Sequence, residues 1–66
     1  MQLGKSLKVA LAVKGLKRKE LAERLSIQPN HVSIWIRTGR ISQTYLEDIC
    51  EALEMPVSEF VRLGEG

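Results

Sequence analysis

A chain of 66 residues allows one small domain, and its single cysteine and single histidine, Cys50 and His31, exclude a disulfide framework and a four-ligand zinc site. No apolar run approaches the roughly 20 residues of a membrane-spanning helix, and none follows the early lysines as in a signal peptide. The formal net charge of +2 conceals an uneven distribution: residues 1–40 carry nine basic and two acidic side chains, and residues 41–66 carry one basic and six acidic ones.

The first predicted helix begins near Leu3 and ends near Lys14, because apolar residues recur there at helical spacing. Gly15 follows at the position where helices commonly end on a glycine. The residues expected on the buried side of this helix are Leu7, Ala10 and Leu11.

A second, short helix starts at about Arg18, and residues 26–28 interrupt it. Pro29 suits the first position of a third helix, because the N–H that proline lacks has no helical partner there. This third helix runs to about Arg37, where Thr38 and Gly39 end it. The apolar stripe of the second helix consists of Leu21, Ala22 and Leu25.

A fourth helix is predicted from a further apolar stripe, and either Ser42 or a capping box of Thr44 and Glu47 could begin it. Pro56 opens a short fifth helix. The stripe of the fourth helix is Tyr45, Leu46, Ile49, Cys50 and Leu53, and that of the fifth is Val57, Phe60 and Val61. The pattern predicts a compact all-α domain of five short helices.

Residues 17–37 have the order of a helix-turn-helix: a short helix, a three-residue turn and a second helix. Ala22 suits the contact between two helices that cross steeply, because only a small residue leaves room there. Ile27 in the turn and Val32 in the next helix would hold the crossing angle.

The segment GLKRKELAERLSIQPNHVSIWIRTG resembles the phage repressor and Cro-like helix-turn-helix family, also called the XRE family. The late segment LEMPVSEF matches as well, so the resemblance covers nearly the whole chain. It implies a lambda-repressor-like DNA-binding domain over residues 1–66, with no catalytic residues, metal or cofactor. The matching residues are Leu16, Glu20, Leu21, Ala22, Leu25, Ile27, Val32, Ser33 and Trp35.

Four residues depart from the family pattern. Lys17 stands where Thr or Ser usually precedes the second helix, and Ser26 stands where the turn usually has Gly. Ile36 follows the tryptophan, where an acid is common, and the closing Gly39 comes one residue late. These departures concern the phosphate contacts more than the fold.

The third helix is the predicted recognition helix. At about 100° per residue, Val32, Trp35 and Ile36 fall on one side and Asn30, Ile34 and Arg37 on the other. Asn30 can pair with adenine N6 and N7, and Ile34 offers an apolar surface to a thymine methyl group. With the resemblance, the expected base contacts are Gln28, Pro29, Asn30, His31, Ser33 and Ile34.

Two of these residues also have a simpler interpretation. Ile34 could belong to the core or to a dimer contact, and His31 could be a solvated polar residue. Trp35 lies on the inner stripe, where a core role is favoured over stacking on a base, and Cys50 is interpreted as a small core residue.

The basic cluster at the start of the second helix opposes the helix dipole, unless a phosphate binds there. Arg37 and Arg40 could flank the groove in the same way after the third helix. The lysines of the first helix are interpreted as a solvated face. The expected phosphate contacts are Lys17, Arg18, Lys19, Arg37 and Arg40.

The acidic C-terminal third is the expected pairing surface of a homodimer, because it avoids the basic half of the chain. The last helix carries more apolar surface than a two-turn helix buries alone, and Leu46 and Met55 could extend it. The expected dimer residues are Val57, Phe60, Val61 and Leu63, although Phe60 and Val61 could instead close the monomer core.

The sequence therefore predicts a bacterial or phage transcription regulator, and it favours a repressor that reads a palindromic operator in double-stranded DNA as a homodimer. We expect it in the cytoplasm, at the nucleoid or in a phage-infected host, with no membrane contact and no small-molecule effector. The uneven charge distribution, taken by itself, would also fit a protein with two solvated faces and no partner. A DNA-binding antitoxin or a restriction–modification controller with a protein partner is the alternative function.

Overall fold

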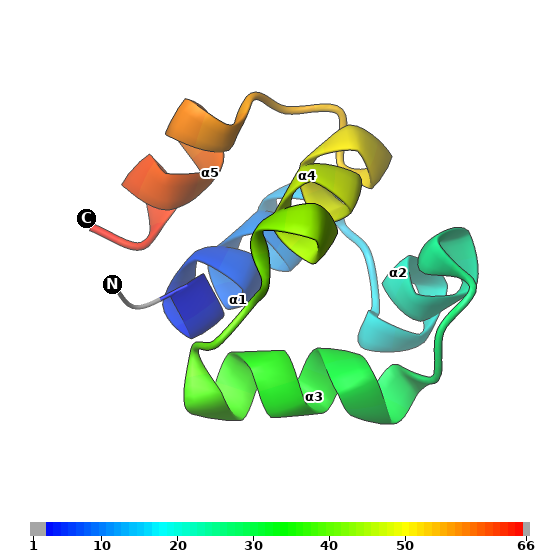
Figure 1. The fold of residues 1–66 in the computed structure, drawn as a ribbon. Helices are drawn as coiled ribbons and strands as arrows, with labels where there is room; N and C mark the ends of the chain where they lie inside the picture. Colours follow the sequence, from blue (N-terminus) through cyan, green and yellow to red (C-terminus); the bar gives the residue numbers. More distant parts are fainter. Residues whose placement is uncertain (1–2, 66) are drawn as a thin grey trace.

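The computed structural model describes residues 3–65, and all of its regular elements are helices (Figure 1). No strand occurs in that range, which confirms the predicted all-α fold. None of these helices combines the length and the apolar composition that a bilayer crossing would need. The helices are α1 (Leu3–Lys14), α2 (Arg18–Leu25), α3 (Pro29–Thr38), α4 (Gln43–Ala52) and α5 (Val57–Leu63).

The ends of the helices follow local signals in the sequence. Gly15 and Gly39 have positive φ angles, 67° and 73°, and follow the last turns of α1 and α3. The Ser42 hydroxyl accepts a hydrogen bond from the Tyr45 N–H at 3.4 Å, so Ser42 and not Thr44 caps α4. Pro56 precedes α5 instead of opening it, and α5 begins at Val57.

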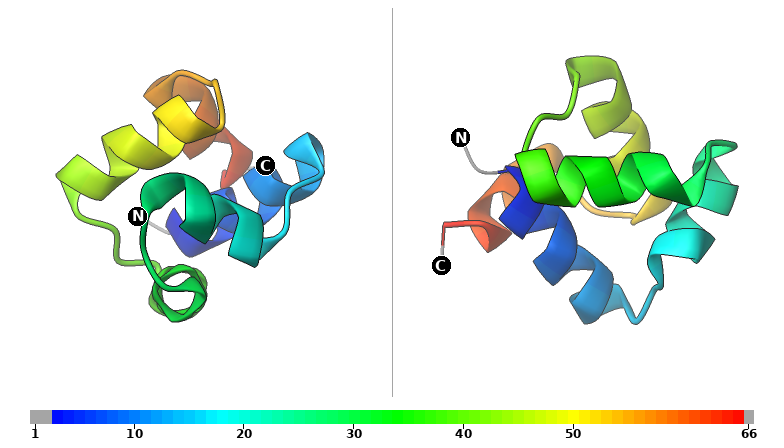
Figure 2. Two further views of the ribbon diagram at one scale, coloured as in Figure 1. Left: turned by 90° about the vertical axis from the view of Figure 1, so that its right-hand side faces the viewer. Right: turned by 90° about the horizontal axis from the view of Figure 1, so that it is seen from below.

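One core joins all the helices. α1 packs against α3 and α5, α2 packs against α3 and α4, and α4 also meets α5. The right-hand view of Figure 2 shows α3 nearest to the viewer, crossing in front of α1 with no other helix covering it. The buried core residues include Leu7, Ala10, Leu21, Ala22, Val32, Trp35, Ile49, Cys50, Leu53 and Phe60.

Gly4 brings α1 and α3 into close contact. A Cβ atom at Gly4 would overlap the carbonyl oxygen of Ile36 and would lie 3.0 Å from the carbonyl oxygen of Trp35. Only a residue without a side chain fits there. The N-terminal turn of α1 therefore supports the C-terminal half of α3 directly, backbone against backbone.

Trp35 and Cys50 are core residues, as predicted. Trp35 is 8% exposed, and its ring lies 5.1 Å from that of Tyr45, between centroids, at an interplanar angle of 50°. Cys50 is 3% exposed, and burial raises the pKa of its thiol. Both residues hold α3 and α4 against the same interior.

The predicted dimer surface is wrong at Phe60. Its side chain is fully buried in the monomer, so it closes the core and has no surface to offer to a partner. Met55, considered as an extension of that surface, is also buried, at 8% exposure. Val57 remains 38% exposed, whereas Val61 and Leu63 are partly buried.

Candidate nucleic-acid interface

The turn between α2 and α3 is closed by backbone hydrogen bonds. The Ser26 N–H donates to the Glu23 carbonyl at 3.2 Å, and the Ile27 N–H donates to the Ala22 carbonyl at 3.0 Å. Ser26 adopts the left-handed conformation, with φ of 57°, which explains why a glycine suits this position. Ala22 is 1% exposed at the crossing of the two helices, and Ile27 packs against the core.

α3 divides into a buried side and an exposed side, as its sequence predicts. Val32 and Trp35 are buried, and Ile36 is partly buried against the core. The six residues predicted to contact bases all keep exposed surface along α3 and at its entry. Ser33 and Ile34 are half-buried, and the exposed members are Gln28, Pro29, Asn30 and His31.

Basic side chains lie in two groups around this surface. Lys17, Arg18 and Lys19 surround the start of α2, and all three are exposed. Arg37 and Arg40 are exposed at the end of α3 and just after it. The first turn of α3 contains no acidic residue, whereas the first turn of α2 contains Glu20.

Lys17 directly precedes α2, at the N-cap position, and its side chain accepts no hydrogen bond. Its backbone N–H donates to Glu20 Oε1 at 3.0 Å, which is the one half of a capping box that lysine allows. The ammonium group of a lysine can only donate, so the first N–H groups of α2 find no partner in it. These groups and the exposed cations together favour an anion at the start of α2.

Arg18 and Ser33 meet across the two helices. Arg18 Nη1 donates a hydrogen bond to Ser33 Oγ at 3.3 Å, although the residues are 15 positions apart. The bond places the Arg18 guanidinium beside the middle of α3. The sequence predicted a role for each residue but gave no sign that they lie together.

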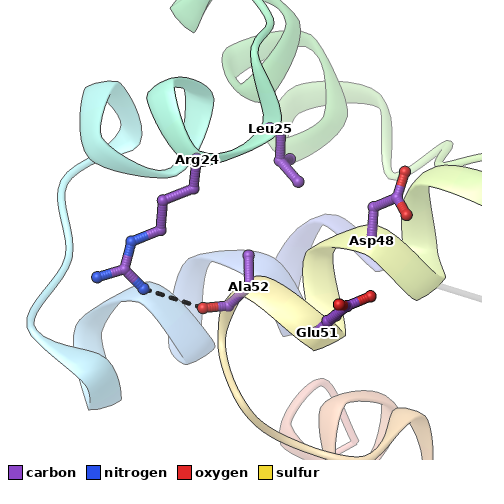
Figure 3. A pocket seen from close by; sticks show the side chains of 5 residues that line it. All are labelled: Arg24, Leu25, Asp48, Glu51 and Ala52. Carbon is purple, nitrogen blue, oxygen red and sulfur yellow. Dashed lines mark hydrogen bonds between the residues drawn. The ribbon is translucent and has the colours of Figure 1, made fainter.

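Arg24 is a basic residue of α2 that the sequence analysis did not single out. Its Nη1 donates to the Ala52 carbonyl at 2.9 Å, at the C-terminal end of α4 (Figure 3). The shallow hollow beside it is also lined by Leu25 and by two acids, Asp48 and Glu51. Arg24 therefore connects α2 to α4, and the two acids beside it would repel phosphates.

The packed α2–turn–α3 unit, with its exposed α3 and flanking cations, defines the class of the protein as a helix-turn-helix DNA-binding protein. The family of Cro/C1-type HTH DNA-binding domains matches residues 6–64, and the chain belongs to this family. The resemblance found in the sequence is thereby confirmed. No curated protein matches the chain in sequence.

Proposed function

We propose that residues 1–66 form one DNA-binding domain that represses transcription by inserting α3 into the major groove of a palindromic operator as a homodimer. The observation that carries this proposal is the uncovered side of α3, with cations beside it at the start of α2 and at its own C-terminal end. Ten residues of α-helix are about 15 Å long, and the major groove, about 12 Å wide, admits such a helix.

The exposed side of α3 supports a division of roles. Asn30 is exposed in the first turn and would pair with adenine, while the half-buried Ile34 would contact a thymine methyl group one turn later. Phosphates on either side of the groove would bind Lys17, Arg18, Lys19, Arg37 and Arg40. Base edges near the N-terminal end of α3 would also meet Gln28, Pro29 and His31.

Binding to duplex DNA is tested by a salt titration and by selection from a random DNA pool. The logarithm of the binding constant should fall linearly with the logarithm of salt concentration, with a slope of about −0.9 for each phosphate neutralised. The selected sequences should share a short motif and its inverted repeat. An affinity that does not depend on salt concentration, or a selected pool without a shared motif, would contradict the proposal.

A homodimer is supported by the need for a longer site. One helix-turn-helix contacts too few base pairs to find its site among the many competitors in a genome. Two copies would place their α3 helices about 34–36 Å apart, one turn of DNA. Val57, 38% exposed at the start of α5, is the apolar residue that we expect at the centre of the contact, with Val61 and Leu63 beside it.

Sedimentation equilibrium and binding to a half-site test this pairing. The wild type should associate, whereas Val57→Asp should remain monomeric and lose its preference for the palindrome over a half-site. Ser58→Asp is the matched control, because it adds the same charge at an exposed position of the same helix. A wild type that stays monomeric and binds half-site and palindrome equally well would rule out the dimer.

A further inference from the structure

Ser33 differs from its neighbours on the exposed side of α3 because its side chain already forms a hydrogen bond with a side chain of α2. Its hydroxyl oxygen accepts the hydrogen bond from Arg18 Nη1 at 3.3 Å. Ser33 is half-buried, whereas Arg18 is exposed. Within residues 3–65, this hydrogen bond joins a side chain of α2 directly to a side chain of α3.

The chemistry of the two groups suggests which one meets DNA. A guanidinium has five N–H donors in a rigid fork, so Arg18 keeps four for an anion after bonding to Ser33. A serine hydroxyl has one proton and two lone pairs, and one lone pair is already used. Arg18 is therefore the better equipped of the two to contact DNA, and its natural partner is a phosphate.

A fixed arginine also binds a phosphate at lower cost than a free one. Ordering a long charged side chain costs conformational entropy, and a prior hydrogen bond to a rigid helix removes part of that cost. Arg37 follows Ser33 by four positions, so it lies on the same side of α3 one turn later. The side chains of Arg18 and Arg37 would then contact phosphates of the same DNA strand.

We infer that Ser33 is a positioning residue, which holds the Arg18 guanidinium beside α3 for a phosphate contact, and that it does not read a base. This inference rests on the proposed DNA binding, and it revises the role that the family resemblance implies for Ser33. Arg18 and Ser33 should then behave as one unit in binding, independent of the sequence of the DNA.

A double-mutant cycle tests the inference, with affinities measured for the selected duplex and for a random-sequence duplex. Ser33→Ala should weaken both duplexes alike, by about two- to tenfold, the usual net effect of one hydrogen bond. In the Arg18→Ala background it should have no further effect. Ser33→Thr keeps the hydroxyl and should retain the wild-type affinity.

The controls separate a loss of folding from a loss of positioning. Alanine favours helix more than serine does, so the helix content of Ser33→Ala, measured by circular dichroism, should not fall. Thr44→Ala removes an exposed hydroxyl from α4 and should leave the affinity for both duplexes unchanged.

Three results would overturn the inference. The first is a loss confined to the selected duplex that persists without Arg18, because Ser33 would then read a base. The second is a Ser33→Ala variant that binds both duplexes as tightly as the wild type. The third is a wild type that binds no duplex, which would overturn the proposed function as well, whereas the first two would leave it intact.

Discussion

α3 and α4 have the same length and bury the same number of residues, yet they present surfaces of opposite charge. Each has 10 residues, each has two in the buried core, and the rings of Trp35 and Tyr45 meet between the two helices. The exposed side of α3 carries Asn30, His31 and Arg37, whereas that of α4 carries Glu47, Asp48 and Glu51. The buried pattern determines how a helix joins this core, and the exposed charge determines whether it can approach a polyanion.

The two helices also differ in the contacts that hold them in the core. The largest expected effect is the loss of stability caused by Gly4→Val, which disturbs the contact of α3 with α1. α3 lies against the backbone of α1 at Gly4, where the carbonyls of Trp35 and Ile36 leave no room for a side chain. A valine would push the two helices apart and cost about 3 kcal/mol. That is a large part of the roughly 3–10 kcal/mol expected for a domain of this size. Thermal and denaturant unfolding measure the loss.

Ala12→Val is the matched control, because it places the same side chain on an exposed position of α1. It should cost only the difference in helix propensity, a few tenths of a kcal/mol. Equal losses in the two variants would mean that α3 does not depend on the close contact at Gly4.

The second prediction compares two exposed side-chain amides, Asn30 in the first turn of α3 and Gln43 at the start of α4. Asn30→Ala should remove discrimination at one base pair, at a cost of about 1–3 kcal/mol, while binding to random duplex remains. Gln43→Ala should change neither affinity. Binding to a set of duplexes, each with one base pair changed, measures the discrimination.

A parallel loss of specific and non-specific affinity in Asn30→Ala would show instead that Asn30 positions α3. An effect of Gln43→Ala on specificity would remove the functional difference between α3 and α4.

The sequence predicts most of the fold because its helix signals are local. Gly15, Pro29 and Gly39 mark helix ends within one or two residues of their own positions, and the spacing of apolar residues identifies the buried side of each helix. The same spacing cannot tell whether an apolar residue faces the core or a second copy. Phe60 shows this, since its place on the stripe fits both and only the packing of α5 on α1 and α4 buries it.

The parts of the site that the sequence missed are contacts between distant residues. Arg18 and Ser33 are 15 positions apart, and Arg24 and Ala52 are 28 apart, so no periodic pattern connects them. Gly4 had no signal either, because a glycine within a helix reveals a close contact only when the neighbouring helix is known. Sequence thus predicts which residues the surface of α3 contains, and tertiary structure determines which of them act together.

A third prediction compares two exposed arginines, Arg37 at the end of α3 and Arg62 in α5. Arg37→Ala should weaken binding to all duplexes about equally and reduce the salt slope by roughly one unit, as expected for one lost phosphate contact. Arg62→Ala removes the same charge away from α3 and should leave the slope almost unchanged. Equal changes in the two slopes would mean that total charge, and not the placement of Arg37, governs binding.

The smallest expected effect separates the two arginines of α2 that form hydrogen bonds. Arg24 donates to the last turn of α4, where the unpaired carbonyls of a helix end carry partial negative charge. Arg24→Ala should therefore lower the free energy of unfolding by about 0.3–1 kcal/mol, because the bond is exposed to solvent. Arg24→Lys keeps a cation near the Ala52 carbonyl and should recover part of this stability. Arg18→Ala should show the reverse pattern, with weaker DNA binding and nearly unchanged unfolding, because its partner is the hydroxyl of Ser33 and not a helix end. If Arg24→Ala lowers the salt slope as Arg18→Ala does, the basic surface extends along the whole of α2, and the acids beside Arg24 do not keep DNA away from it.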